Sequence, residues 1–133
     1  MNAVYNGKLR CTAEHLQSGT VIETDAPTDN HGLGERFSPT DLVATALGTC
    51  ILTTLALLTE KDGINLDGSS CSVNKVMASA PRRIAALEVV LTFTAKGLST
   101  EQRNKIAHVA ETCPVAKSLH PDLKQILTFN WPD

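Results

Sequence analysis

The sequence is poor in aromatic residues and has no cluster of basic ones. Its 133 residues include one Trp, one Tyr and three Phe, so we expect no platform on which nucleic-acid bases could stack. The net charge is −2 at pH 7, and no run of five or more Lys or Arg residues is present. This charge argues against binding to nucleic acid or to an acidic membrane surface. We therefore expect neither nucleic acid nor a membrane as a partner.

Signals for export and for zinc binding are also missing. The first residues, MNAVYNGKLRCTAEH, lack a basic segment followed by an apolar one, so we expect no signal peptide and a cytoplasmic protein. None of the four cysteines forms a Cys-x-x-Cys pair, and no histidine lies at zinc-ligand spacing from them. An intracellular chain seldom carries structural disulfides. Cys11 and Cys71 fall in strand-like segments, where we expect small buried side chains.

A long apolar segment lies in the middle of the chain. Ser38 followed by Pro39, with Asp41 three residues after the cap, is typical of a capping box at a helix start. Gly63 is typical of a helix end, so we expect a helix from Pro39 to about Lys61. The segment is apolar on nearly every face, which predicts a helix buried on all sides. One chain of this length can hardly cover such a helix on all sides. The simplest explanation is that a second copy of the chain packs over it, so we predict a homodimer.

Strand and helix patterns surround this segment. Ser99 with Gln102 three residues later predicts a second capped helix, which ends near Thr112. A short helix is expected at 114–119, a loop at 26–37, and strands at 3–12, 19–25, 64–78, 84–96 and 124–131. The order is β-β-α-β-β-α-α-β, with mostly antiparallel strands. We therefore predict an α+β protein with a single domain over residues 1–133.

Two of the cysteines are candidates for chemistry. Cys113 directly precedes Pro114, which suits the first position of a helix, so Cys113 would be the N-cap. Free N–H groups and the helix dipole would then point at its sulfur, and this environment lowers the pKa of a thiol. Cys50 lies in the middle of the long apolar helix, where periodicity alone predicts a core residue. Sequence spacing does not show that the two sulfurs meet.

The segments SPTDLVATALGTC and ETCPVAKSL resemble the OsmC/Ohr family of thiol-dependent hydroperoxide reductases. In that family a long central helix carries one cysteine, and a Cys-Pro-Val motif follows some sixty residues later; here Cys50 and Cys113 are 63 residues apart. The resemblance covers nearly the whole chain, and CPVAKSL is its most specific part. It implies an OsmC-like fold, in which an antiparallel β-sheet wraps a long buried central helix within an intertwined homodimer.

The resemblance also implies an activity in oxidative-stress defence and a role for each thiol. Cys50 would be the peroxidatic cysteine that attacks an organic hydroperoxide and becomes a sulfenic acid. Cys113 would be the resolving cysteine that forms a disulfide with it, and an external dithiol, often a lipoyl group in this family, would restore both thiols. No metal or bound cofactor is needed. Arg36, in the Arg-Phe pair before the helix, is the expected cation near Cys50.

One departure from the family leaves alternatives open. Family peroxidases carry a glutamate ten residues before the first cysteine, and here that position is Thr40. A second hypothesis is therefore a non-catalytic redox sensor, or a small apolar ligand-binding protein, on the same fold. A third makes Cys50 and Cys113 plain core residues, with the fold serving only as an assembly element. Separately, the alternative for Arg36 is a solvated loop arginine paired with Glu35 or Asp41.

Overall fold

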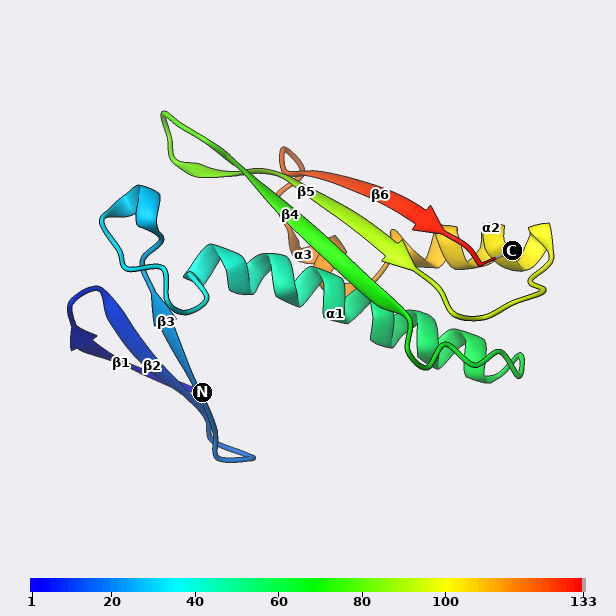
Figure 1. The fold of residues 1–133 in the computed structure, drawn as a ribbon, viewed down its shortest axis with the longest axis horizontal. Coiled ribbons are helices and arrows are strands. Elements are labelled where there is room, and N and C mark those ends of the chain that lie inside the picture. Colours follow the sequence, from blue (N-terminus) through cyan, green and yellow to red (C-terminus); the bar gives the residue numbers. More distant parts are fainter. Residues whose placement is uncertain (133) are drawn as a thin grey trace. The chain divides into compact units, whose positions relative to one another are not determined.

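The computed structural model describes residues 1–132 and shows an α+β chain with two small sheets (Figure 1). The elements in chain order are β1 (Asn2–Gly7), β2 (Arg10–His15), β3 (Thr20–Asp25), η1 (Thr28–Asn30), α1 (Pro39–Glu60), β4 (Ser70–Ala78), β5 (Arg83–Thr92), α2 (Thr100–Ala110), α3 (Pro114–Ser118) and β6 (Lys124–Asn130). The chain divides into two compact units, residues 1–43 and the rest, with the boundary inside α1. That residues 1–133 form one domain stays a prediction.

The N-terminal unit contains a three-stranded antiparallel sheet in the order β1-β2-β3. The prediction of one strand over residues 3–12 was wrong, because the chain turns back within it. Lys8 and Leu9 connect β1 to β2, and both have positive φ, at 53° and 62°. A two-residue hairpin turn requires this conformation, which usually calls for Asn or Gly. The side chains of Lys8 and Leu9 therefore gave no turn signal.

The C-terminal unit contains the second three-stranded sheet, in the order β4-β5-β6. The expected single sheet is corrected to two sheets, and β6 runs parallel to β5. The other strand pairs are antiparallel, so the prediction of mostly antiparallel strands is confirmed. The connection from β5 to β6 contains α2 and α3, as a connection between parallel strands requires. Cys113 lies between these two helices and is therefore part of the crossover.

Both ends of α1 form as local sequence signals predict. The Asp41 carboxylate accepts a hydrogen bond from the Ser38 N–H at 2.9 Å, and the Asp41 N–H donates to the Ser38 hydroxyl at 3.1 Å. At the other end the N–H of Ile64 donates to the Thr59 carbonyl and the N–H of Gly63 to the Glu60 carbonyl. This pattern with Gly63 at φ 69° is a Schellman motif. The second predicted capping box, Ser99 with Gln102, is likewise confirmed at the start of α2.

The core of the C-terminal unit lies between one face of its sheet and the helices (Figure 1). Leu87, Val89 and Leu91 alternate along β5 and point to this face, while Glu88 between them is exposed. They pack in one cluster with Leu47, Ile51 and Leu55 of α1, Ile106 and Ala110 of α2, and Ala116 of α3. The site described below is built on this cluster.

The expectation that α1 is buried on all sides is wrong for the single chain. Its buried residues repeat every three or four positions and are Ala44, Leu47, Gly48, Ile51, Leu55 and Thr59. The opposite side remains accessible, and Leu57 is 66% exposed. Within the C-terminal unit only one side of α1 packs against the sheet β4-β5-β6, and its other side carries exposed apolar residues such as Leu57. By length and composition alone α1 could also cross a membrane, a property that core helices of soluble proteins share.

Candidate functional site

The short helix α3 begins at Cys113, as the Cys-Pro pair predicts. Cys113 has extended backbone angles, Pro114 occupies the first helical turn, and the Cys113 sulfur accepts a hydrogen bond from the Ala116 N–H at 3.4 Å. The side chain of Cys113 is completely buried and belongs to the apolar cluster of the C-terminal unit. The sulfur is therefore an N-cap acceptor inside the core, closed off from water.

Cys50 meets Cys113 from the middle of α1. It is half-buried, it packs against the same apolar cluster, and it lies close enough to Cys113 to raise the pKa of that thiol. Both are free thiols. The structure thus brings together the two cysteines that the sequence singled out, 63 residues apart in the chain. Cys50 is partly accessible, and Cys113 is fully buried.

The expected direction of the Cys113 pKa shift was wrong. Burial raises the pKa of the Cys113 thiol above its ordinary value, and contact with Cys50 adds to the rise. Hydrogen bonds from the N–H groups of Ala116 and Val115 act in the opposite direction, as predicted for an N-cap. They do not outweigh the loss of hydration, because a thiolate in an apolar core is poorly solvated. Cys113 is therefore a protonated thiol at neutral pH.

The other two cysteines lie on strands. Cys71 is half-buried on β4 against Gly48 of α1, and burial raises the pKa of its thiol. Cys11 is half-buried on β2 in the N-terminal sheet. Among residues 1–132 no group of three or more His, Cys, Asp or Glu side chains is placed to hold a metal ion.

Sequence reasoning missed one residue beside the pair. Gln125 of β6 alternates with Leu127 and Phe129, so its side chain lies on the sheet face that covers the core. Its Nε2 donates a hydrogen bond to the carbonyl of Ala116 in α3, at 2.9 Å. The sequence signal for Gln125 is a polar residue at a position of the strand KQILTFN where the alternation predicts an apolar one. A polar residue on the core face of a strand is more informative than one on the exposed face.

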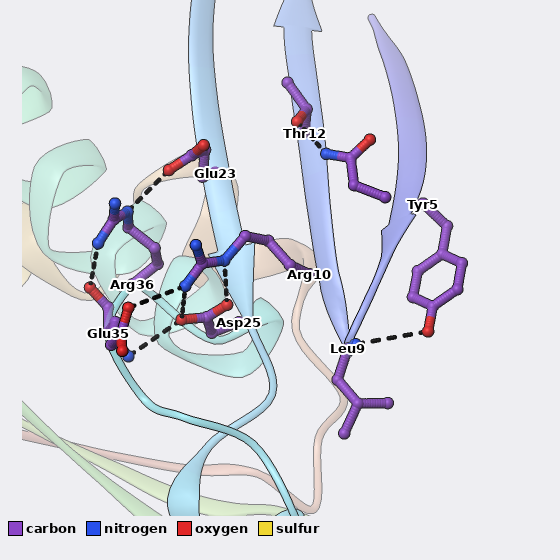
Figure 2. Close-up of polar contacts among 9 residues, drawn as sticks. Tyr5, Leu9, Arg10, Thr12, Glu23, Asp25, Glu35 and Arg36 are labelled. Carbon is purple, nitrogen blue, oxygen red and sulfur yellow. Dashed lines mark hydrogen bonds and ion pairs between the residues drawn. The ribbon is translucent and has the colours of Figure 1, made fainter.

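Arg36 lies in the N-terminal unit and takes part in a network of ion pairs (Figure 2). Its Nε donates to the Glu23 carboxylate at 2.8 Å, and its Nη1 donates to the Glu35 carbonyl at 3.0 Å. Its side chain is 45% exposed. Cys50 belongs to the other unit, so the predicted pairing of Arg36 with Cys50 stays a prediction. Thr40, in place of the family glutamate, contacts the Ser38 hydroxyl at 3.2 Å.

The half-buried Arg10 and the buried Asp25 belong to the same network (Figure 2). Arg10 donates from Nε and Nη2 to the two carboxylate oxygens of Asp25, at 2.7 and 3.0 Å, and Nη2 also reaches Glu35 at 3.1 Å. The Glu35 N–H donates to the Asp25 carboxylate at 3.0 Å. These bonds hold the pKa of Asp25 below its usual range, with Arg10 as the main cause, and they raise the pKa of Arg10. Asp25 thus fixes the loop that carries Arg36.

Comparisons with known proteins agree with this picture. Residues 32–126 match the family described as OsmC-like protein. A crystal structure from Psychrobacter arcticus 273-4, of a protein named for a proposed role in osmotic stress and detoxification, is 43% identical with a TM-score of 0.93, covering 97% of this chain and 93% of that one. Among curated proteins, none matches the chain.

Two more distant structures share the fold. An OsmC-like protein from Mycoplasma pneumoniae is 19% identical with a TM-score of 0.83, over 99% of this chain and 95% of that one. An organic hydroperoxide resistance protein OsmC from Legionella pneumophila is 18% identical with a TM-score of 0.73, over 97% and 95%. At these identities the likeness concerns the fold alone.

Proposed function

Because the chain belongs to the OsmC-like protein family, we propose that it reduces organic hydroperoxides with Cys50 and Cys113. The observation that carries this proposal is the contact between a half-buried and a fully buried thiol, both free, in one apolar cluster. The Legionella pneumophila protein that shares this fold is named for organic hydroperoxide resistance.

The difference in exposure suggests which thiol acts first. Cys50 is partly accessible, so a peroxide can reach it, while Cys113 is sealed in the core. The Cys50 thiolate attacks the outer peroxide oxygen, the O–O bond breaks, and the alcohol leaves with a proton. The Cys113 sulfur then attacks the Cys50 sulfenic acid, forming an S–S bond and releasing water. An external dithiol, of lipoyl type in our proposal, reduces this disulfide by two exchange steps.

The surroundings of Cys50 favour an apolar peroxide. Its neighbours are the aliphatic side chains of the core cluster, which offer apolar surface and few polar groups. An alkyl or aryl hydroperoxide gains from covering such surface, whereas hydrogen peroxide does not. We therefore propose organic hydroperoxides as the substrates, in defence against oxidative stress.

The uncovered side of α1 supports a homodimer. Leu57 is 66% exposed on α1, and Val4, Tyr5 and Phe37 of the N-terminal unit are each more than half exposed. A monomer seldom leaves so much apolar surface in water. We propose that a second copy of the chain covers these residues, which would form the intertwined dimer that the family resemblance implies.

A redox sensor or a small apolar ligand-binding protein is the second candidate. Thr40 carries no charge where family peroxidases have a glutamate, and the pKa of Cys113 is raised. Both features weaken fast turnover but still permit a Cys50–Cys113 disulfide. In this alternative, oxidation would lock the disulfide, or a ligand would bind, without appreciable consumption of peroxide.

Stopped-flow kinetics of the reduced protein with cumene hydroperoxide separate these candidates. The proposal predicts rapid consumption of the peroxide, slower consumption of hydrogen peroxide, and a mass loss of about 2 Da per chain on disulfide formation. Cys50→Ser should abolish turnover, and Cys113→Ser should gain about 16 Da as the sulfenic acid accumulates. Cys71→Ser is the matched control and should react like the wild type. Full turnover in Cys50→Ser would refute the proposal.

A further inference from the structure

The half-buried amide of Gln125 lies in an otherwise apolar row of β6. In the parallel pairing it lies beside Leu87 of β5, which is fully buried, and the row continues through Leu127 and Phe129. An amide that loses its hydration costs free energy unless it finds a hydrogen-bond partner. Leu or Val would fill this position without that cost. The placement of a glutamine here therefore calls for a specific contact.

That contact is with the helix that carries Cys113. Gln125 Nε2 donates to the carbonyl of Ala116 at 2.9 Å, and the N–H of the same Ala116 donates to the Cys113 sulfur at 3.4 Å. The helix α3 has five residues, which is too short to hold its shape by internal hydrogen bonds alone. The hydrogen bond from Gln125 thus connects β6 to Ala116, the residue whose N–H points at the Cys113 sulfur.

We propose that Gln125 is a positioning residue for Cys113, holding α3 so that its N–H groups stay directed at the sulfur while Cys113 attacks Cys50. The inference rests on the proposed function, because it assigns Cys113 the resolving step. The attacking species is the thiolate, which is disfavoured in this buried site. N–H donors that stabilise its charge matter most in such surroundings, because low polarity strengthens each hydrogen bond.

The attack of Cys113 on Cys50 can be followed without any peroxide, using dithionitrobenzoate on a protein that carries Cys11→Ser and Cys71→Ser. The Cys50 thiolate attacks one sulfur of the reagent, the S–S bond of the reagent breaks, and one coloured thionitrobenzoate leaves. The Cys113 thiolate then attacks the Cys50 sulfur of this mixed disulfide and displaces the second thionitrobenzoate. The first phase reports Cys50, and the second reports Cys113.

The expected result is a selective loss in the second phase. Gln125→Met keeps the length of the side chain but removes the donor, and it should slow the second phase by about three- to tenfold, the effect of one hydrogen bond, with the first phase unchanged. Leu127→Met, a change in the same row of β6, is the matched control and should leave both phases as they are. An unchanged second phase in Gln125→Met would overturn the inference.

Gln125→Glu provides a readout that a merely structural role would not move. An ionised carboxylate cannot donate to the Ala116 carbonyl, so the second phase should be slow relative to wild type at pH 7 to 8. A protonated carboxyl group can donate, so the ratio to wild type should recover as the pH falls through the pKa of the glutamate, about 4 to 5. A ratio that stays constant with pH would count against a hydrogen bond to α3.

The assay separates this inference from the proposed function. If the wild type consumes no hydroperoxide but the second phase is still slower in Gln125→Met, the peroxidase proposal fails and the positioning role remains. If the Cys11→Ser, Cys71→Ser protein with Gln125 intact releases one thionitrobenzoate per chain and no second phase appears, Cys113 does not attack Cys50 and the inference fails. If thermal unfolding shows that Gln125→Met does not fold, Gln125→Glu is used for the test instead.

Discussion

The Cys71 sulfur occupies the space that a side chain at Gly48 would need. A Cβ placed on Gly48 would lie 2.6 Å from Cys71 Sγ and 3.0 Å from Val73 Cγ2. The absence of a side chain at Gly48 thus lets α1 pack directly on β4. Alanine forms helices better than glycine by about 1 kcal/mol, so two opposing effects meet at this position.

We expect Gly48→Ala to lower the free energy of unfolding by about 1 kcal/mol, because overpacking of roughly 1–3 kcal/mol outweighs the helix propensity of alanine. Urea denaturation measures this change. Adding Cys71→Ala should restore part of the loss, so that the two substitutions are not additive. Ala46→Gly, on the exposed side of α1, is the control, because it measures the difference in helix propensity between alanine and glycine alone. A Gly48→Ala protein more stable than wild type would contradict the close approach.

Asp25→Asn should remove an acid-dependent part of the stability. The folded-state pKa of Asp25 is lowered, mainly by Arg10, so its contribution is present above the unfolded-state pKa of about 4 and is lost as the pH falls through the folded value. The difference in unfolding free energy between wild type and Asp25→Asn should therefore shrink on acidification. Urea titrations at several pH values test this expectation.

Glu23→Gln is the matched control for Asp25→Asn. The pair between Glu23 and Arg36 is about half exposed on both sides, and such a pair contributes under about 1 kcal/mol. Its removal should cost little at any pH. Equal losses in the two variants would mean that the burial of Asp25 adds nothing to its ion pair.

Leu57→Glu should weaken the proposed dimer by roughly tenfold or more, because a charge would then lie in an apolar contact without a partner. The oligomeric state, measured by light scattering over a range of protein concentrations, gives the result. Asn104→Glu adds the same charge to an exposed position of α2 and should leave the association unchanged. A Leu57→Glu protein with the wild-type association constant would show that this side of α1 is not the interface.

Stability should fall at alkaline pH because of Cys113. Burial raises the folded-state pKa of its thiol, so the unfolded chain loses the proton first. The contribution of the neutral thiol is complete below the unfolded-state pKa of about 8.5 and is lost as the pH rises through the raised folded value. Cys113→Ala should show a flatter decline between pH 8 and 10 in thermal unfolding. Cys11→Ala serves for comparison, and an equally steep decline in Cys113→Ala would refute the assignment.

Features that depend on neighbouring residues could be predicted from the sequence. The capping boxes at Ser38 and Ser99 and the N-cap at Cys113 form as expected, because each needs only residues within one helical turn. The positive φ of Lys8 and Leu9 could not be predicted from these two side chains, and the one local turn signal is Gly7, with φ 86°, directly before them. The conformation of this turn is fixed by the pairing of β1 with β2.

Features that depend on packing could not be predicted from the sequence. The N-cap position of Cys113 predicts a lowered pKa, but the surrounding core reverses its direction. The partners of Gln125 and of Arg10 likewise lie in other elements, and no local pattern names Ala116 or Asp25 as those partners. The parallel course of β6 is a property of the whole sheet.

The parallel strand β6 also bears on how the protein is made. Both candidate thiols precede β6 in the chain, so during synthesis they leave the ribosome before the strand that ties α3 to the sheet. The hydrogen bond from Gln125 to α3 can therefore form only after both cysteines have been synthesised. In the proposed mechanism, the resolving step of Cys113 thus gains its positioning contact last, when the final strand joins the sheet.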